Sequence, residues 1–203
     1  MRSSRASGRA AYIIKRALDF GLAACGLALT APLWAVIALL IRRDSPGPVL
    51  FRTTRVGRAG RPFTMYKFRT MHVDAEAQLA SLADRNLGGP YMIKIPDDPR
   101  VTRLGRILRR TSLDELPQLL NVLRGEMSLV GPRPQAPNEV ALYTPYQRRR
   151  LAVLPGITGL WQVTARHSPS FDEWVRLDLA YIDGWSLGLD LGILLRTIGA
   201  IFG

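Results

Sequence analysis

The stretch ALDFGLAACGLALTAPLWAVIALLI occupies residues 17–41 and is almost entirely apolar. A helix needs ~20 apolar residues to cross a bilayer, so this stretch is long enough to do so. Asp19 lies near its start and Pro32 near its middle, and a proline inside a helix removes a hydrogen bond and kinks or breaks the helix. The stretch therefore predicts a membrane helix that breaks at Ala31 and Pro32.

Both flanks of this helix are basic, whereas a spanning helix carries most of its lysine and arginine on the cytoplasmic side. The flanking residues are Arg2, Arg5, Arg9, Lys15 and Arg16 before the stretch, and Arg42, Arg43, Arg52, Arg55, Arg58 and Arg61 after it. Equal flanks predict that the helix enters the membrane and returns. We therefore expect three parts: a basic cytoplasmic N-terminus at residues 1–16, a re-entrant membrane helix at 17–41, and a cytoplasmic domain at 42–203 on the membrane surface.

Two other interpretations of the apolar stretch remain open. A buried helix of a soluble protein is disfavoured by the length of the stretch and by its lack of polar periodicity. A cleaved signal peptide has an apolar core of only ~7–15 residues, which is shorter than this one.

The composition indicates a folded protein with an anionic partner. The chain has 203 residues, of which 47% are hydrophobic and 22% charged, with a net charge of +12. Such an excess of positive charge favours nucleic acid, an acidic membrane or phosphate-bearing substrates as partners. Cys25 is the only cysteine, so no intrachain disulfide forms, and the widely separated His72 and His167 give little support for a zinc or haem site.

The rest of the chain predicts a mostly α fold with a short β-hairpin, an α+β arrangement. Alternating residues around a glycine-rich bend predict the hairpin at residues 48–71. Helical patterns are expected at residues 75–87, up to Arg110, around residue 115, at 138–151 and at 170–185, with a turn and an extended piece at 154–163. The apolar C-terminal segment at 185–203 fits either core packing or an interfacial helix. No βαβ succession is present, which argues against a Rossmann sheet.

Two adjacent carboxylates, Asp114 and Glu115, lie among several arginines: Arg109, Arg110, Arg124 and Arg133. Neighbouring residues reach one site most easily at a helix start, and Pro117 supports a start with Asp114 as the N-cap. The alternative is a capping box in which Glu115 reaches back to Ser112. Two acids with several arginines instead fit a site for a metal and a diphosphate.

Several segments together resemble one family. They are KRALDF, the apolar stretch with its central proline, RRDSPGPVLFRTTRVGRAGRPF, YKFRTM, DPRVTRLGRILRRTSLDELPQLLNVLRGEMSLVGPRP, LPGITGLWQV and LDLAYIDGWSLGLDLGILLRTI. In this order they resemble the monotopic phosphoglycosyl transferases, which are bacterial sugar transferases acting on polyprenyl phosphate. The resemblance implies the small form of the family, with the catalytic domain at residues 42–203.

The resemblance implies that the chain transfers a sugar-1-phosphate from a UDP-sugar to undecaprenyl phosphate and releases UMP. Asp114 would be the nucleophile, forming a covalent phosphosugar–aspartyl intermediate, and Glu115 would help hold the Mg²⁺ cofactor with Asp114 or manage a proton. The implied phosphate or nucleotide contacts are Lys67, Arg69, Arg109 and Arg133. Asp178 and Asp190 match acidic family positions, with a structural role favoured over a role in the site.

The resemblance also implies a bacterial cytoplasmic membrane location with both termini cytoplasmic, an anionic phospholipid surface as partner, and a first membrane step in exopolysaccharide or glycoconjugate synthesis. The chain departs from the family pattern at Ala31, where a serine is usual, and in TARHSPSF at residues 164–171, a loop on which sugar choice could depend. A membrane-anchored nucleic-acid-binding module and an inactive scaffold remain the rival functions. The sugar, the pathway and the oligomeric state, a dimer included, stay open.

Overall fold

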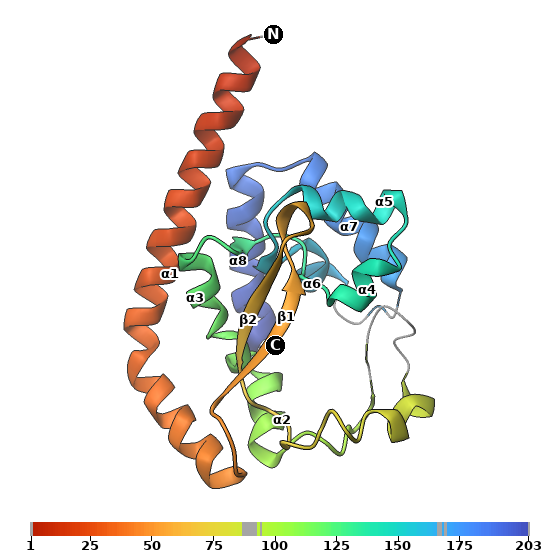
Figure 1. The fold of residues 1–203 in the computed structure, drawn as a ribbon. Helices are drawn as coiled ribbons and strands as arrows, with labels where there is room; N and C mark the ends of the chain where they lie inside the picture. The colour runs from red at the N-terminus through yellow and green to blue at the C-terminus, as the bar shows by residue number, and fades with distance from the viewer. Residues whose placement is uncertain (1, 87–92, 94, 166–167, 169, 203) are drawn as a thin grey trace.

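The computed structural model describes residues 2–86, 93, 95–165, 168 and 170–202. One long helix, α1 (Arg2–Asp44), lies alongside a body of short helices and two small sheets (Figure 1). The predicted mostly helical character and the predicted hairpin are both confirmed. Two parts of segments for which we made predictions lie outside the described residues: residue 87, at the end of the helix expected at 75–87, and residues 166, 167 and 169 of the TARHSPSF loop.

Helix α1 is continuous through Pro32, so the predicted break is replaced by a bend (Figure 1). A proline lacks the N–H that would reach the carbonyl four residues earlier, and a helix commonly kinks there. Two residues before the proline, the Thr30 hydroxyl donates to the carbonyl oxygen of Gly26 at 2.6 Å. A hydroxyl bonded back in this way also favours bending. The helix further includes most of the residues expected to form a separate basic N-terminus.

Both halves of α1 pack on the rest of the protein. Ala23, before the bend, joins a buried cluster with Met65 and Val122, and Ile37 and Ile41, after the bend, join a second cluster. Polar residues reinforce the first contact: the backbone N–H of Leu129 donates to Asp19 at 3.1 Å. A single body therefore covers one face of the helix on both sides of Pro32.

The other face of α1 is apolar and exposed. Its exposed side chains include Ile13, Ile14, Leu18, Phe20, Leu22, Leu29, Val36, Leu39 and Leu40. Over Ala10–Asp44 the helix is long and apolar enough to cross a membrane, and only 11% of its apolar window is buried within the protein. This small buried share contradicts the interpretation of the stretch as a core helix of a soluble protein.

The middle of the chain contains two small sheets of two strands each. Strands β1 (Leu50–Val56) and β2 (Pro62–Phe68) pair antiparallel across the 3-10 turn η1 (Arg58–Gly60). Strands β3 (Ser128–Val130) and β4 (Gly156–Thr158) form a parallel pair that the sequence analysis did not predict. Their close approach depends on glycine: a Cβ on Gly156 would lie 2.1 Å from the backbone nitrogen of Gly131.

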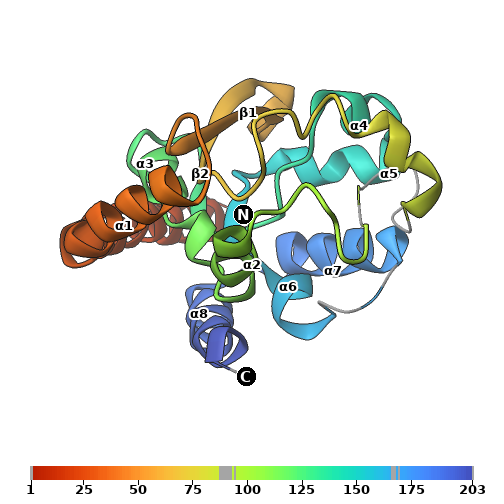
Figure 2. The ribbon, with the colours of Figure 1, turned by 90° about the horizontal axis from the view of Figure 1, so that it is seen from below.

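The remaining elements are short, and α4 and α5 lie on the opposite side of the molecule from α1 (Figure 2). They are η2 (Ala80–Arg85), α2 (Arg103–Arg110), η4 (Leu113–Glu115), α3 (Gln118–Leu123), α4 (Pro137–Ala141), α5 (Pro145–Arg148), η5 (Arg149–Ala152), α6 (Leu160–Thr164), α7 (Phe171–Asp183) and α8 (Leu187–Phe202). Helices α2, α7 and α8 lie where helices were expected. Over residues 75–86 the chain forms turns followed by the short 3-10 helix η2, so no α-helix is present in the described part of the segment where one was predicted.

The prediction of a single helix at 138–151 is wrong. Thr144 caps a new helix at this point, because its hydroxyl accepts from the N–H of Gln147 and Pro145 occupies the first turn. A proline is tolerated in the first turn of a helix, because the backbone N–H that it lacks would have no acceptor within the helix at that position. The extended segment predicted at 154–163 is also only half correct, since β4 is followed directly by α6.

Candidate active site

The two carboxylates lie in η4, on the short connection between α2 and α3. Ser112 precedes them with a left-handed backbone (φ 56°), which is uncommon for a residue with a side chain and is often found at functional sites. The N-cap of α3 is Pro117 and not Asp114, so the helix begins three residues later than predicted. After Ser112, both carboxylates lie within reach of Lys67 on β2.

The capping-box alternative is wrong. The hydroxyl of Ser112 makes no capping hydrogen bond. The side chain of Glu115 instead binds two cations: its Oε1 lies 2.8 Å from Lys67 Nζ and 2.7 Å from an Arg133 guanidinium nitrogen. Glu115 therefore joins β2 to the turn after β3.

Lys67 lies between the two carboxylates. Its Nζ is 3.5 Å from Asp114 Oδ2, compared with 2.8 Å from Glu115. Only 6% of Asp114 is exposed, so water solvates little of this carboxylate, although its contact with the cation is long. Glu115 is thus tightly ion-paired, whereas Asp114 is buried with one long contact to a cation.

The pKa values of the two carboxyl groups shift in opposite directions. Burial raises the pKa of Asp114, and the negative charge of Glu115 adds to this, while Lys67 and the nearby arginines offset only part of it. Burial also acts to raise the pKa of Glu115, but Arg133 and Lys67 together outweigh it and hold this pKa far below its usual range. Paired carboxylates with divergent pKa values are a mark of sites in which the two groups have different tasks.

The carboxylates open onto a cleft of about 1640 Å³, which is large enough for a sizeable ligand. Its wall is rich in arginine: Arg42, Arg52, Arg55, Arg69, Arg100, Arg109 and Arg133 line it. Such a wall fits a ligand that carries several negative charges, because guanidinium groups bind phosphate oxygens through parallel hydrogen bonds.

Six predicted residues lie outside α1 besides the dyad itself, and the structure brings two of them into contact with it. Lys67 and Arg133 contact the carboxylates, and Arg109 lines the cleft with its Nε donating to the Thr70 hydroxyl at 2.9 Å. Arg69 makes no ion pair with the dyad among the described residues. Its guanidinium holds the turn after α1 instead, donating to the carbonyl oxygens of Pro46 and, at 2.8 Å, Ser45.

The two remaining acids, Asp178 and Asp190, bind partners within the fold. Asp190 accepts from Lys15 at 2.6 Å and from Tyr181 at 2.7 Å, so it ties α8 to α1 and α7. Asp178 pairs with Arg150. Both acids are thus held by partners within the fold, and the structural role favoured by the sequence analysis stays a prediction.

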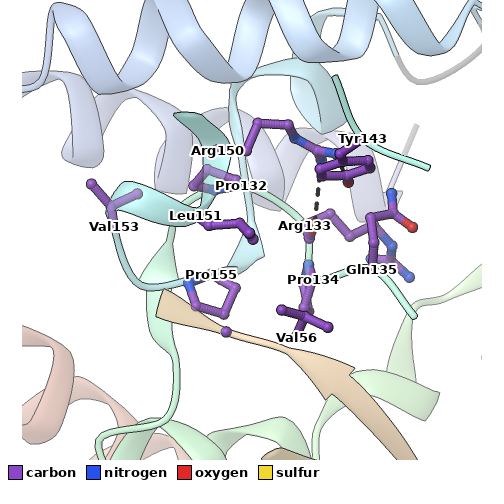
Figure 3. A pocket seen from close by; sticks show the side chains of 11 residues that line it. Val56, Pro132, Arg133, Pro134, Gln135, Tyr143, Arg150, Leu151, Val153 and Pro155 are labelled. Atoms are coloured by element: carbon purple, nitrogen blue, oxygen red, sulfur yellow. Dashed lines mark hydrogen bonds between the residues drawn. The ribbon is translucent and has the colours of Figure 1, made fainter. Parts of the chain in front are cut away.

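The GPRP turn at residues 131–134 holds Arg133 in place, and Figure 3 shows its surroundings. The backbone carbonyl of Arg133 accepts from Arg150 at 3.3 Å, and that of Pro132 accepts from Gly156 at 2.9 Å. The sequence analysis overlooked Arg150, because it stands in a run of three arginines in which nothing distinguishes the buried one from its solvated neighbours.

The dyad is a sparse site for a metal ion. No group of three or more His, Cys, Asp or Glu side chains is close enough to hold a metal among the residues described. Mg²⁺ does not need such a group, because it keeps several waters and commonly binds one or two carboxylates together with substrate phosphates. Asp114 and Glu115 therefore fit Mg²⁺ only in the presence of a phosphate ligand.

Comparison with known proteins now identifies the family. Residues 10–203 match the model of the bacterial sugar transferase family. The chain belongs to the bacterial sugar transferases. This membership confirms the predicted resemblance, and the dyad, YKFRTM and GPRP are the segments that meet in its cleft.

Three relatives of this bacterial sugar transferase have informative names. The chain is 46% identical over 190 residues to the galactosyl transferase CpsE of Streptococcus agalactiae, covering 93% of this chain and 42% of CpsE. It is 45% identical over 195 residues to the UDP-glucose:undecaprenyl-phosphate glucose-1-phosphate transferase of Caulobacter vibrioides, covering 92% and 69%. It is 39% identical over 193 residues to the exopolysaccharide production protein ExoY of Sinorhizobium fredii, covering 93% and 85%. The chain thus spans less than half the length of CpsE.

Proposed function

We propose that this bacterial sugar transferase moves a sugar-1-phosphate from a UDP-sugar to undecaprenyl phosphate. The observation that carries the proposal is the asymmetry of the dyad: Glu115 Oε1 is ion-paired to both Lys67 and Arg133, whereas Asp114 is buried in a cationic cleft with one ion pair to the described residues, of 3.5 Å to Lys67. A carboxylate held in this way is positioned to attack phosphorus, and the cleft arginines are positioned to neutralise phosphate charge.

The proposed reaction has two displacements. An oxygen of Asp114 attacks the sugar-bearing phosphorus of the donor, the bond from that phosphorus to the bridging oxygen breaks, and UMP leaves with the electron pair. A phosphate oxygen of undecaprenyl phosphate then attacks the same phosphorus, and the bond to Asp114 breaks. The carboxylate is regenerated, and the lipid carries a diphosphate-linked sugar.

Each nearby side chain has a proposed task in these steps. Glu115 holds Lys67 and Arg133 beside the dyad in the cleft, where both cations can bind phosphates of the UDP-sugar. Arg109 reaches the same cleft from the end of α2. When bound to Asp114, Glu115 and the donor diphosphate, Mg²⁺ would supply further neutralisation of the charge on the leaving UMP.

We further propose that the enzyme is monotopic on the bacterial cytoplasmic membrane, with both termini and the catalytic domain cytoplasmic. A straight span would leave one half of α1 far from a cytoplasmic domain, yet residues on both sides of Pro32 pack on the same body. Exposed Leu191, Leu195 and Ile198 on α8 add a second apolar surface for the membrane.

The decisive experiment measures UMP release and covalent labelling with UDP-sugars, undecaprenyl phosphate and Mg²⁺. Asp114→Asn should abolish turnover and leave no phosphosugar adduct on the protein. Glu115→Gln should reduce turnover strongly, because Lys67 and Arg133 lose the negative charge that they share, while some adduct can still form. Near-normal turnover of Asp114→Asn would show that the nucleophile is another group. A panel of donors in the same assay identifies the sugar.

A further inference from the structure

A buried ion pair lies directly behind the turn that carries Arg133. Arg150, from η5, contacts Asp178 of α7 at 2.7 Å, and the two side chains are only 2% and 1% exposed. The remaining carboxylate oxygen of Asp178, Oδ1, has no hydrogen-bond partner among the described residues. Within that part of the chain, Arg150 is therefore the group that binds this carboxylate.

The guanidinium of Arg150 is used on every side. Its Nε and one terminal nitrogen bind Asp178, and the second terminal nitrogen donates to the hydroxyl of Tyr143. The first terminal nitrogen also donates to the carbonyl oxygen of Arg133 at 3.3 Å (Figure 3). The group lies 5.6 Å from the centre of the Tyr143 ring and 5.5 Å from that of Phe171. A planar fork is needed to satisfy these directions at once, which a lysine ammonium does not provide.

The carbonyl oxygen of Arg133 is an important point of attachment for the turn, because the turn has few backbone N–H donors. Pro132 and Pro134 have no N–H, so the backbone around Arg133 is fixed mainly through its carbonyl oxygens. The N–H of Gly156 donates to the carbonyl oxygen of Pro132 at 2.9 Å, and the N–H of Val56 donates to the carbonyl oxygen of Gln135 at 2.9 Å. Between these two hydrogen bonds, Arg150 donates to the carbonyl oxygen of Arg133, the residue whose side chain binds Glu115.

Stability alone is a poor explanation for such a pair. Taking two charges out of water costs about as much as their attraction returns, and apolar residues of similar volume often stabilise a fold equally well or better. A buried pair can instead fix one arrangement among several. A displacement of about 1 Å at a group that binds the reacting phosphate can cost up to about a hundredfold in rate.

We propose that Arg150 and Asp178 are positioning residues that act on catalysis through the backbone of Arg133. They touch no substrate themselves: Asp178 orients Arg150, Arg150 holds the carbonyl of Arg133, and the turn then presents the Arg133 guanidinium beside Glu115 and the donor phosphate. This inference rests on the proposed function, since it needs Arg133 to bind a phosphate of the donor.

The test is a double-mutant cycle on kcat/KM for the UDP-sugar. Asp178→Asn should lower kcat/KM about 10- to 100-fold in the wild-type background. In the Arg133→Ala background the same change should lower it less than about threefold, because no guanidinium remains to be positioned. Losses that are independent of each other would multiply instead. UMP release with saturating undecaprenyl phosphate supplies the rates, and thermal melting reports folding separately.

The neighbouring pair Arg149 and Asp183 provides a matched control. It joins the same two elements, with contacts of 2.8 and 2.9 Å, but its side chains are 49% and 59% exposed and no described contact links it to the GPRP turn. Arg149→Lys and Asp183→Asn should leave kcat/KM unchanged within about twofold, as expected for an exposed ion pair.

If Asp178→Asn does not fold, Tyr143→Phe replaces it, since it removes only the hydroxyl that binds Arg150. It should lower kcat/KM about threefold or more and lose that effect in the Arg133→Ala background. Equal fold losses in both backgrounds, or no loss in the wild type, overturn the positioning role. If Arg133→Ala itself retains full activity, the proposed task of Arg133 is wrong, which is a separate result from failure of the pair.

Discussion

Replacing Arg133 by lysine separates phosphate recognition from simple positive charge. The net charge is unchanged, but the geometry is not. One terminal nitrogen of the Arg133 guanidinium donates to Glu115 at 2.7 Å, and this is its only hydrogen bond to the described residues. The other N–H groups of the planar fork remain available to a donor phosphate, and the side chain is 31% exposed to the cleft. A single ammonium cannot hold Glu115 and grip a phosphate in two parallel bonds.

The expected magnitude follows from losing one charge-assisted hydrogen bond. Such a bond contributes about 1.5–3 kcal/mol, and each ~1.4 kcal/mol changes a rate tenfold. Arg133→Lys should therefore lower kcat/KM for the UDP-sugar about 10- to 150-fold. The turn is stiffened by two prolines and held by Arg150, so little rearrangement of the backbone is available to recover the lost contact.

The assay is UMP release under one set of conditions, with Arg148→Lys as the control. Arg148 ends α5 on an exposed surface and makes no ion pair within the described part of the chain. Arg58 is a poorer control, because it donates to the Tyr12 hydroxyl on α1 at 3.1 Å. Equal effects at Arg133 and Arg148, or none at Arg133, would refute the reasoning and assign the basic residues to membrane attraction alone.

Three further predictions address topology, pH and the metal. In a Cys25→Ser background, Arg5→Cys and Arg58→Cys should both be labelled only from the cytoplasmic side of oriented vesicles, and Pro32→Ala should move part of the population toward labelling from opposite sides; opposite labelling without Pro32→Ala would establish a true span. Burial raises the pKa of Asp178 to about 6 from an ordinary 3.8, so the folded state holds this proton more tightly than the unfolded state. As pH rises through the range in which this carboxyl loses its proton, the wild type should lose folding free energy relative to Asp178→Asn, which melting in detergent at each pH measures, and parallel pH curves would contradict this. EDTA should abolish UMP release and excess Mg²⁺ should restore it, whereas full activity in EDTA would exclude the proposed metal.

Local patterns in the sequence predicted the elements whose cause is local. A nearly continuous apolar run predicts a helix where α1 lies, although not its continuity through Pro32, alternation around a glycine bend predicts the β1–β2 hairpin, and spacing predicts α2, α7 and α8. Adjacent acids among arginines predicted a site, and the structure places both acids on a cleft lined by arginines. These features depend on residues close together in the chain, so their physical causes are present before the chain folds. Thr144 and Pro145, which begin α5, are a local signal of a helix start that our prediction overlooked, although the sequence contains it.

Only the tertiary structure decided which side chains meet. Lys67 of β2, Glu115 of η4 and Arg133 of the GPRP turn lie far apart in sequence, and they come together because a parallel β3–β4 pair and two glycines allow close backbone approach. Arg69 and Arg150 show the same limit. Both are arginines in basic segments, yet one holds a turn after α1 and the other a buried aspartate. Packing across the chain selects a guanidinium's partner, and residue type and spacing do not encode that choice.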